Sequence, residues 1–488
     1  MRLLFTWLIL LTAGASAADK SRWVEIRSPN FLVVSNGGER PARRIAGQFE
    51  QIRAVFKTSL KMKVDPGKPF IVLAVKDEKS MRELLPEYWE TKGQVHPAGV
   101  FFAGIEKHYV ILRLDTEGDN PFHVVYHEYV HMLVDLNFRQ LPLWLNEGLA
   151  EFFGNSVLGE KEIGLGRPSV SSLRILNSTK LMPLPLLLTV DHASPFYNES
   201  EKANVFYAES WALVHYLQLG SRDRRGMLDA YFRFLRDDGD PVQSAEKAFG
   251  DLRALARELE SYAAQPAFSY AKLKPPAEVQ EETLPARELS AAESDVAQAD
   301  FLMQARHVKE ARALIEEALR LEPKLAGAHE AMGLFHFRSR QRAEAAREFS
   351  QAADLDSRNF LTHYYRAVLG NQDEAEESSR ETALRRSIEL NPNFAPAQDA
   401  LAGLLVRTNR NKEEALKLIT RAVQLEPGVS NHWLNLGQVL LALNRLDDAR
   451  RLAEKLFAEA HTTEEKWRAE TMRNDVKEYE REIGRAHV

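Results

Sequence analysis

Two spacings of apolar positions predict the secondary structure of the first half of the chain. Short apolar runs rich in β-branched residues predict strands, at 23–26, 31–35, 69–75, 99–103 and 109–113. Apolar residues three and four positions apart predict amphipathic helices, at 40–60, 77–85, 122–136, 144–153 and 204–219. This order of strands and helices is typical of an α+β domain built on a mixed sheet.

The pattern changes after residue 290, where the chain repeats itself. Similar segments end at intervals of 34, 35 and 35 residues, at Pro323, Ser357, Pro392 and Pro427. This is the period of tetratricopeptide repeats, in which each unit is a pair of helices. Small residues recur where paired helices would approach closely, at Gly333, Ala367, Gly403 and Gly437. We expect about five helix pairs over 291–461 and a charged capping helix over 462–488.

A single repeat cannot bury its apolar face alone, so the pairs are expected to stack into an all-α solenoid with a concave surface. We expect that surface to bind a peptide or protein partner. A rigid spacer would show the same periodic residues, and it stays open as the alternative.

Two further segments differ from these regions in composition. Residues 1–17 combine Arg2, the apolar run 3–11 and small residues at 15–17, which predicts a secretory signal peptide. Residues 266–290 hold four prolines among charged residues and predict a linker. The α+β domain is then expected over 18–265. The mature protein is expected to be exported, to the periplasm or the extracellular medium.

Charge and cysteine content narrow the classes of partner and metal ligand. The 488 residues carry 64 Lys and Arg against 70 Asp and Glu, and loss of residues 1–17 removes one Arg, so the net charge goes from −6 to −7. This net negative charge gives no indication that the protein binds nucleic acid. The chain has no cysteine, which excludes disulfides and thiolate ligands and leaves His and carboxylates to bind a metal. No other long apolar run predicts a membrane span.

The helix predicted over 122–136 carries the strongest chemical signal, the sequence His-Glu-Tyr-Val-His. His127 and His131 are four residues apart, so both rings project from one face, close enough to hold one metal ion. Glu128 is rotated away from that pair, where its carboxylate can deprotonate a water at the metal. These are the roles that the H-E-x-x-H spacing gives its residues.

The helix predicted over 144–153 places Glu147 and Glu151 one turn apart on one face. Glu147 is the candidate third ligand, an anionic oxygen that leaves a fourth zinc position open. Glu151 is expected to accept the second ring N–H of a liganding histidine and to fix its orientation. His123 and Asp135 share the i+4 column of the two histidines and could brace the site. A surface position is expected for His123, and Asp135 would be a ligand only if Glu147 did not reach.

The sequence HEYVH followed by WLNEGLAEFF resembles the gluzincin metallopeptidases, in which the glutamate of N-E-G is the third zinc ligand. The resemblance implies one Zn²⁺ held by His127, His131 and Glu147, with Glu128 as general base. A metzincin site would instead need Gly and His at positions 134 and 137, where this chain has Val and Asn.

Within the gluzincins, residues 23–262 are most similar to the peptidase MA-like domains of secreted bacterial proteins that also carry tetratricopeptide repeats. Gluzincins usually place a Tyr or His donor near the reacting carbonyl, and Tyr207 is the candidate here, with His215 behind it. Tyr207 on a simply buried helix face is the alternative. The resemblance also implies that a strand beside the cleft, 99–103 or 109–113, pairs with an extended substrate; a plain core hairpin is the other possibility. The G-A-M-E-N motif of zinc aminopeptidases is absent, so their specificity does not transfer.

These features predict an exported zinc metallopeptidase, with a zincin-like α+β domain that hydrolyses peptide bonds and a repeat domain that binds a substrate or partner. Two alternatives remain. One is a catalytically silent interaction protein with a zinc-binding domain, and the other is a zinc hydrolase of a non-peptide amide.

Overall fold

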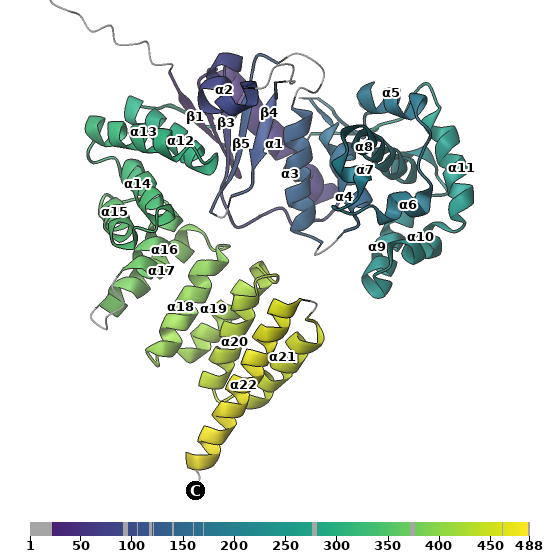
Figure 1. Ribbon diagram of the computed structural model, residues 1–488. Helices are drawn as coiled ribbons and strands as arrows, with labels where there is room; N and C mark the ends of the chain where they lie inside the picture. Colours follow the sequence, from purple (N-terminus) through teal and green to yellow (C-terminus); the bar gives the residue numbers. More distant parts are fainter. Residues whose placement is uncertain are drawn as a thin grey trace, which may run out of the picture.

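The computed structural model describes residues 22–90, 96–104, 106–116, 120, 122–138, 141–159, 161–168, 170–275, 281–370, 376–460 and 462–486. The predicted signal peptide over 1–17 lies outside these residues. Within the described part of the chain, every helix is too short or too polar to cross a bilayer. A mixed sheet, a helical lobe beside it and a curved array of helix pairs make up the molecule (Figure 1).

The sheet has six strands in the order β4 (Gly99–Phe102), β5 (His108–Arg113), β3 (Phe70–Val75), β2 (Phe31–Ser35), β1 (Val24–Arg27) and β9 (Ala286–Glu288). β2, β3 and β5 are parallel, and the other three strands pair antiparallel with their neighbours. The five predicted strands are confirmed to within one residue at each end. Of the two strands that could border a cleft, β4 lies at the edge and β5 lies inside the sheet.

Both faces of the sheet are buried, and strand β3 shows how. All six of its residues are apolar and buried. Phe70, Val72 and Ala74 join the core shared with helices α1 (Glu39–Ala54) and α3 (His123–Asp135). Ile71, Leu73 and Val75 point the other way and join a core shared with the first helix pairs of the repeat array. The sheet is therefore the middle layer of three, with α3 on one side and α12 (Ala291–Gln304) on the other (Figure 1).

The lobe beside the sheet is mainly helical. Helix α3 is followed by α4 (Leu143–Gly154), which packs against both α3 and α8 (Ser200–His215). The connection between α4 and α8 folds into the short elements β6 (Val157–Leu158), β7 (Ile163–Leu165), α5 (Val170–Ser178), α6 (Leu184–Thr189) and α7 (Pro195–Asn198). After α8, the lobe is completed by α9 (Met227–Asp238), α10 (Pro241–Phe249) and α11 (Leu252–Ala263).

Gly148 allows the close approach of α4 to α8. A Cβ at this position would lie 2.6 Å from the carbonyl oxygen of Ser210 and 2.7 Å from Val214 Cγ2. Gly148→Ala should therefore force the two helices apart and lower the free energy of unfolding by about 1–3 kcal/mol. Urea denaturation measures this change. Gly403→Ala is the matched control, because Gly403 sits in an exposed helical position where an added Cβ would have no described atom within 4 Å, and it should gain about 0.5–1 kcal/mol.

Glu209 on α8 is fully buried and is held by one backbone donor, the N–H of Met182 at 2.8 Å. Burial raises the pKa of Glu209 to about 8, against 4.5 for a free side chain. Because the pKa is higher in the folded than in the unfolded state, protonated Glu209 contributes stability that is fully present below pH 4.5. This stability falls by about 1.4 kcal/mol per pH unit as the pH rises toward 8. Glu209→Gln should therefore raise the melting temperature more at pH 8 than at pH 5. An equal gain at both pH values would contradict a protonated Glu209.

The segment 266–290, expected as a linker, contributes strands to both sheets. Within it, β8 (Ala271–Leu273) pairs with β7 in a three-stranded sheet, and β9 pairs with β1. The prolines and charges fit this placement, because both strands lie at sheet edges, where β9 is exposed and β8 is partly exposed. Composition alone therefore did not show that two parts of this connection, 271–273 and 286–288, are paired into sheets.

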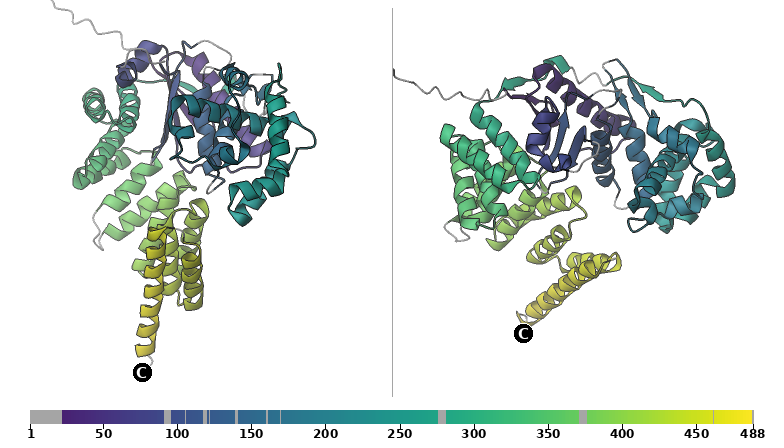
Figure 2. Two further views of the ribbon diagram at one scale, coloured as in Figure 1. Left: turned by 45° about the vertical axis from the view of Figure 1, so that its right-hand side comes forward. Right: turned by 45° about the horizontal axis from the view of Figure 1, so that its top comes forward.

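Five helix pairs follow, and they agree with the expected number. They are α12 with α13 (Val308–Leu321), α14 (Ala326–Arg338) with α15 (Arg342–Asp354), α16 (Phe360–Leu369) with α17 (Glu377–Leu390), α18 (Ala395–Arg407) with α19 (Lys412–Leu425), and α20 (Ser430–Ala442) with α21 (Leu446–Ala458). The capping helix is α22 (Thr463–Ala486), at the far end of the stack (Figure 2).

The predicted role of small residues in the repeats holds at two glycines and fails at a third. A Cβ on Gly333 would lie 3.0 Å from the ring of Phe349, and one on Gly437 would lie 2.3 Å from Met472. Gly403 has no such neighbour among the described residues and is exposed. It therefore marks the repeat register without being required for helix packing.

The first repeats are attached to the sheet by polar contacts as well as by the shared core. Arg338 pairs with Glu106 at 2.9 Å, and Tyr365 donates a hydrogen bond to the same carboxylate at 3.1 Å. Asp300 on α12 contacts both Lys107 and the hydroxyl of Tyr109. The sheet and the first repeats therefore form one packed body.

Candidate metal centre

Two helices supply all of the predicted ligands. His127 and His131 lie one turn apart on α3, and Glu147 and Glu151 lie one turn apart on α4. The helices come close where α4 ends: a Cβ on Gly154 would lie 3.1 Å from the backbone nitrogen, Cα and Cβ of His127. This close approach lets the side chains of α4 reach the histidines.

Three atoms of these side chains converge on one point. His127 Nε2 and His131 Nε2 lie 3.0 Å apart, and each lies 3.2 Å from Glu147 Oε2. Glu147 and His127 are buried, and among the described residues Glu147 Oε2 has no hydrogen-bond partner of regular geometry. The structure thus brings together the ligand set expected from the sequence.

The other nitrogen of each ring faces an acceptor. His131 Nδ1 lies 2.9 Å from the amide oxygen of Asn146, and His127 Nδ1 lies 3.2 Å from Glu151 Oε1. Each acceptor favours a proton on Nδ1, which leaves a lone pair on Nε2. Three lone-pair donors then face one another, an arrangement that a bound cation would relieve.

The donor set fits zinc. Nitrogen and oxygen ligands at about 2.0–2.1 Å from a tetrahedral zinc lie about 3.3 Å apart, close to the separations found here. Two imidazoles and one carboxylate leave a fourth position for water or substrate. His127, His131 and Glu147 could therefore hold a catalytic zinc.

The close contacts between carboxylates and histidines also shift the pKa values of these side chains. Burial lowers the pKa of His127, but the contacts with Glu147 and Glu151 outweigh burial and raise it to about 9. Burial raises the pKa of Glu147, but the contacts with the two histidines outweigh burial and lower it to about 2. The two carboxylates therefore favour a proton on His127 when no metal is bound, and metal binding there would displace that proton.

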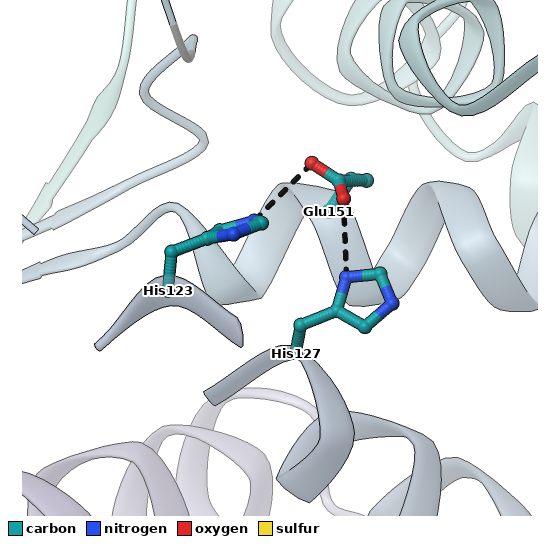
Figure 3. Close-up of side chains that lie close together, drawn as sticks. All are labelled: His123, His127 and Glu151. Carbon is teal, nitrogen blue, oxygen red and sulfur yellow. Dashed lines mark ion pairs between the residues drawn. The ribbon is translucent and has the colours of Figure 1, made fainter. Parts of the chain in front are cut away.

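Glu151 lies between two histidines (Figure 3). Its Oε2 is 3.2 Å from His123 Nε2, and its Oε1 is 3.2 Å from His127 Nδ1. Asn155 donates a third contact to Oε2 at 3.1 Å. Glu151 thus lies within reach of His127 Nδ1, and its orienting role stays a prediction. The expectation of a surface position for His123 is wrong, since this half-buried side chain contacts Glu151.

His123, His127 and Glu151 form a second group that could hold a metal. This group would use His127 Nδ1, whereas the first group uses His127 Nε2. A neutral imidazole has only one lone pair, so the two groups are alternatives. We favour His127, His131 and Glu147, because Asn146 and Glu151 both act there as acceptors that orient the rings.

Two tyrosines line the centre on the side of α8. Tyr207 is half-buried, with its ring centroid 6.4 Å from that of His127. Tyr197 lies beside it, at 6.3 Å between rings, and its hydroxyl is 3.5 Å from Glu147 Oε1. Burial and the charge of Glu147 raise the pKa of both tyrosines, and Glu128 adds to the effect at Tyr197. Both hydroxyls are therefore neutral donors.

Other expected residues lie elsewhere. His215 is fully buried and bonds the hydroxyl of Tyr262 at 2.6 Å, with its ring packed on Trp211 and Phe268. Asp135 is exposed and belongs to neither group of potential ligands. The residues that sequence reasoning missed are Asn146 and Tyr197. Asn146 adjoins Glu147 in the motif, but its contact with His131 depends on how two helices cross.

Comparison with known protein families identifies two regions. A family described as a protein of unknown function, DUF1570, matches residues 123–238, which run from α3 to α9 and include every candidate ligand. A tetratricopeptide repeat family matches residues 413–470. No curated protein matches the chain. The match to tetratricopeptide repeats, a class that binds peptides and proteins, thus lies in the last helix pairs of the array.

Several solved repeat proteins are similar to part of the chain. YrrB, a tetratricopeptide repeat protein with an unusual peptide-binding site, is 19% identical, with 37% of this chain and 92% of that chain covered and a TM-score of 0.33. Pseudomonas aeruginosa PilF is 15% identical, with coverages of 40% and 91% and a TM-score of 0.30. TTC0263 of Thermus thermophilus is 16% identical, with coverages of 37% and 98% and a TM-score of 0.28.

Proposed function

We propose that the protein is an exported, zinc-dependent peptidase of the gluzincin type, with a zincin-like α+β domain. One observation carries the proposal: His127 Nε2, His131 Nε2 and Glu147 Oε2 converge to within 3.2 Å of one another. Glu128, the residue next to His127, remains outside this ligand set and is half-buried. A structural metal site would need only the ligands, so a free carboxylate beside them favours catalysis.

His127, His131 and Glu147 would hold the zinc. Zinc bound there would lower the pKa of its water to about 7 and polarise the substrate carbonyl. Glu128 takes a proton from the attacking water and gives it to the leaving amine. Tyr207, or Tyr197 beside it, donates its hydroxyl proton in a hydrogen bond to the carbonyl oxygen as negative charge develops.

Strand β4 offers a place for an extended substrate. It is an edge strand of the six-stranded sheet, and among the described residues its outer side pairs with no other strand. Helix α3 lies directly against it, because Gly99 of β4 faces Val125 of α3. A peptide added to this edge would run beside the helix that carries both histidines.

The repeats support a second function that does not depend on turnover. Their stacked helices form a protein-binding module, so the chain could be a scaffold whose zinc domain is silent. In the peptidase, the same module would recruit a protein substrate or partner.

Cleavage of a diverse peptide library separates the two functions. Residues 18–488 are incubated with the library as the zinc-loaded protein, after removal of metal with a chelator, and after zinc is restored. We expect cuts, read by mass spectrometry, that disappear with the metal and return with it. No cuts by zinc-loaded protein would favour the scaffold.

A further inference from the structure

A polar cavity of about 840 Å³ lies beside the candidate metal centre. Its walls come from the start of α3, from the end of α4 through β6, from the segment after β7 through α5, from α8 and from the residue that precedes β8. The residues that matter here are His123, Glu151, Arg167, Tyr207 and Tyr270. The volume is within the range of pockets that bind small molecules, or one side chain with its neighbours.

The cavity adjoins the metal centre through two of its lining residues. Glu151 and Tyr207 line it, and both also contact His127, at 3.2 Å and through the two rings respectively. A group bound in the cavity would therefore lie beside His127, on the side of the ring where Nδ1 faces Glu151. In a peptidase, this is the location of a pocket for a residue near the scissile bond.

Arg167 gives one wall a positive charge. Its guanidinium lies 4.4 Å from the centre of the Tyr270 ring, and Lys272 approaches the same ring at 5.3 Å. Among the described residues, no carboxylate forms an ion pair with Arg167, and its buried Nε has no hydrogen-bond partner. The one acidic residue among those that line the cavity is Glu151, whose two carboxylate oxygens lie 3.2 Å from His123 Nε2 and His127 Nδ1.

The stacking of Arg167 holds its guanidinium in place. Arg167 Nε and the ring of Tyr270 both lie over Gly164, 3.3 and 3.2 Å from the position of a Cβ. Tyr270 also forms a side-chain hydrogen bond with Arg167. A guanidinium carries five N–H donors, so this bond leaves donors for the two oxygens of a carboxylate.

We propose that this cavity binds a carboxylate of the peptide substrate, and that Arg167 recognises it. The inference rests on the proposed function and specifies the substrate class: peptides with an acidic side chain, or a free carboxyl terminus, close to the bond that is cut. These two sources present the same group to Arg167, so the test must separate them.

The test uses two matched peptide pairs and two readouts. One pair differs by Glu or Gln beside the cleaved bond, and the other by a free or amidated carboxyl terminus. Binding is measured by fluorescence anisotropy with the zinc-loaded Glu128→Gln protein, and kcat/KM is measured with the wild type. We expect one acid to bind, and to be cleaved, about 10- to 100-fold better than its amide, since a charge-assisted bidentate contact has this effect.

Arg167→Ala should reduce that acid-to-amide ratio to near one in both readouts, and Arg167→Lys should keep part of it. Arg174→Ala is the matched control, because Arg174 is an exposed residue of α5 outside the cavity lining, and it should retain the wild-type ratio. Melting temperatures show whether each variant is folded.

The outcomes separate the two proposals. If wild-type protein cuts peptides with no preference for either acid, the carboxylate site is wrong and the peptidase stands. If nothing is cut but an acid binds in preference and Arg167→Ala removes that preference, the site stands and the peptidase is wrong. An acid preference that survives Arg167→Ala would also overturn the site.

Discussion

Glu128→Gln should lower peptide hydrolysis by at least about a hundred-fold while zinc stays bound, since general acid–base catalysis contributes about 10²–10⁴. Gln keeps the size of the side chain but cannot accept a proton. Glu128 is outside the group formed by His127, His131 and Glu147, so the metal should be retained. Zinc content by atomic absorption and kcat/KM on one cleaved peptide give the two readouts.

The control measurements for this variant are its melting temperature and its binding of the substrate. Glu128 is half-buried, so the melting temperature should change little, and the substrate should still bind. Undiminished hydrolysis by the zinc-loaded variant would remove Glu128 as the base. Loss of zinc in the variant would show that Glu128 supports the metal instead of acting on the water.

Glu147→Ala should weaken zinc binding more than any single change outside the ligand set. Glu147 Oε2 is the atom that lies 3.2 Å from both Nε2 atoms, and it supplies the only negative charge of the ligand set. Competition with a chromogenic chelator at fixed pH measures the affinity. The loss should exceed the 10- to 100-fold change typical of residues that only orient ligands.

Glu151→Gln and Asp135→Asn rank the other carboxylates in the same assay. Glu151 contacts His123 and His127 but not His131, so its loss should weaken zinc binding by about 10- to 100-fold. Asp135 is exposed and should have no effect. A larger loss from Glu151→Gln than from Glu147→Ala would instead favour the site formed by His123, His127 and Glu151.

The sequence identified the parts of the site that depend on position within one helix. The spacing of His127 and His131 on α3, and of Glu147 and Glu151 on α4, follows from 3.6 residues per turn, and it could be read directly. Which of them meet across the two helices was supplied by the N-E-G likeness and not by spacing. The contact of Asn146 with His131 depends on how two helices cross, and that of Tyr197 with Glu147 depends on the path of a long connection. Neither contact could be predicted from the sequence.

The fold shows the same limit. The apolar run over 69–75 correctly predicted a strand. Its burial on both faces fits the continuous apolar run, because a strand with one solvent-exposed face alternates apolar and polar residues. The run could not show what covers each face. The short strands β8 and β9 were missed because exposed edge strands tolerate the prolines and charges that also mark linkers.

The shared core between sheet and repeats has a consequence for how such proteins can evolve. Domains exchanged by recombination must keep their apolar surfaces covered when they change neighbours. Here one face of the sheet, including Ile71, Leu73 and Val75, is covered by helices that belong to the repeat array. A gene fragment ending at residue 265 would encode a sheet with that face uncovered, so we expect recombination to carry the neighbouring repeats along with this half.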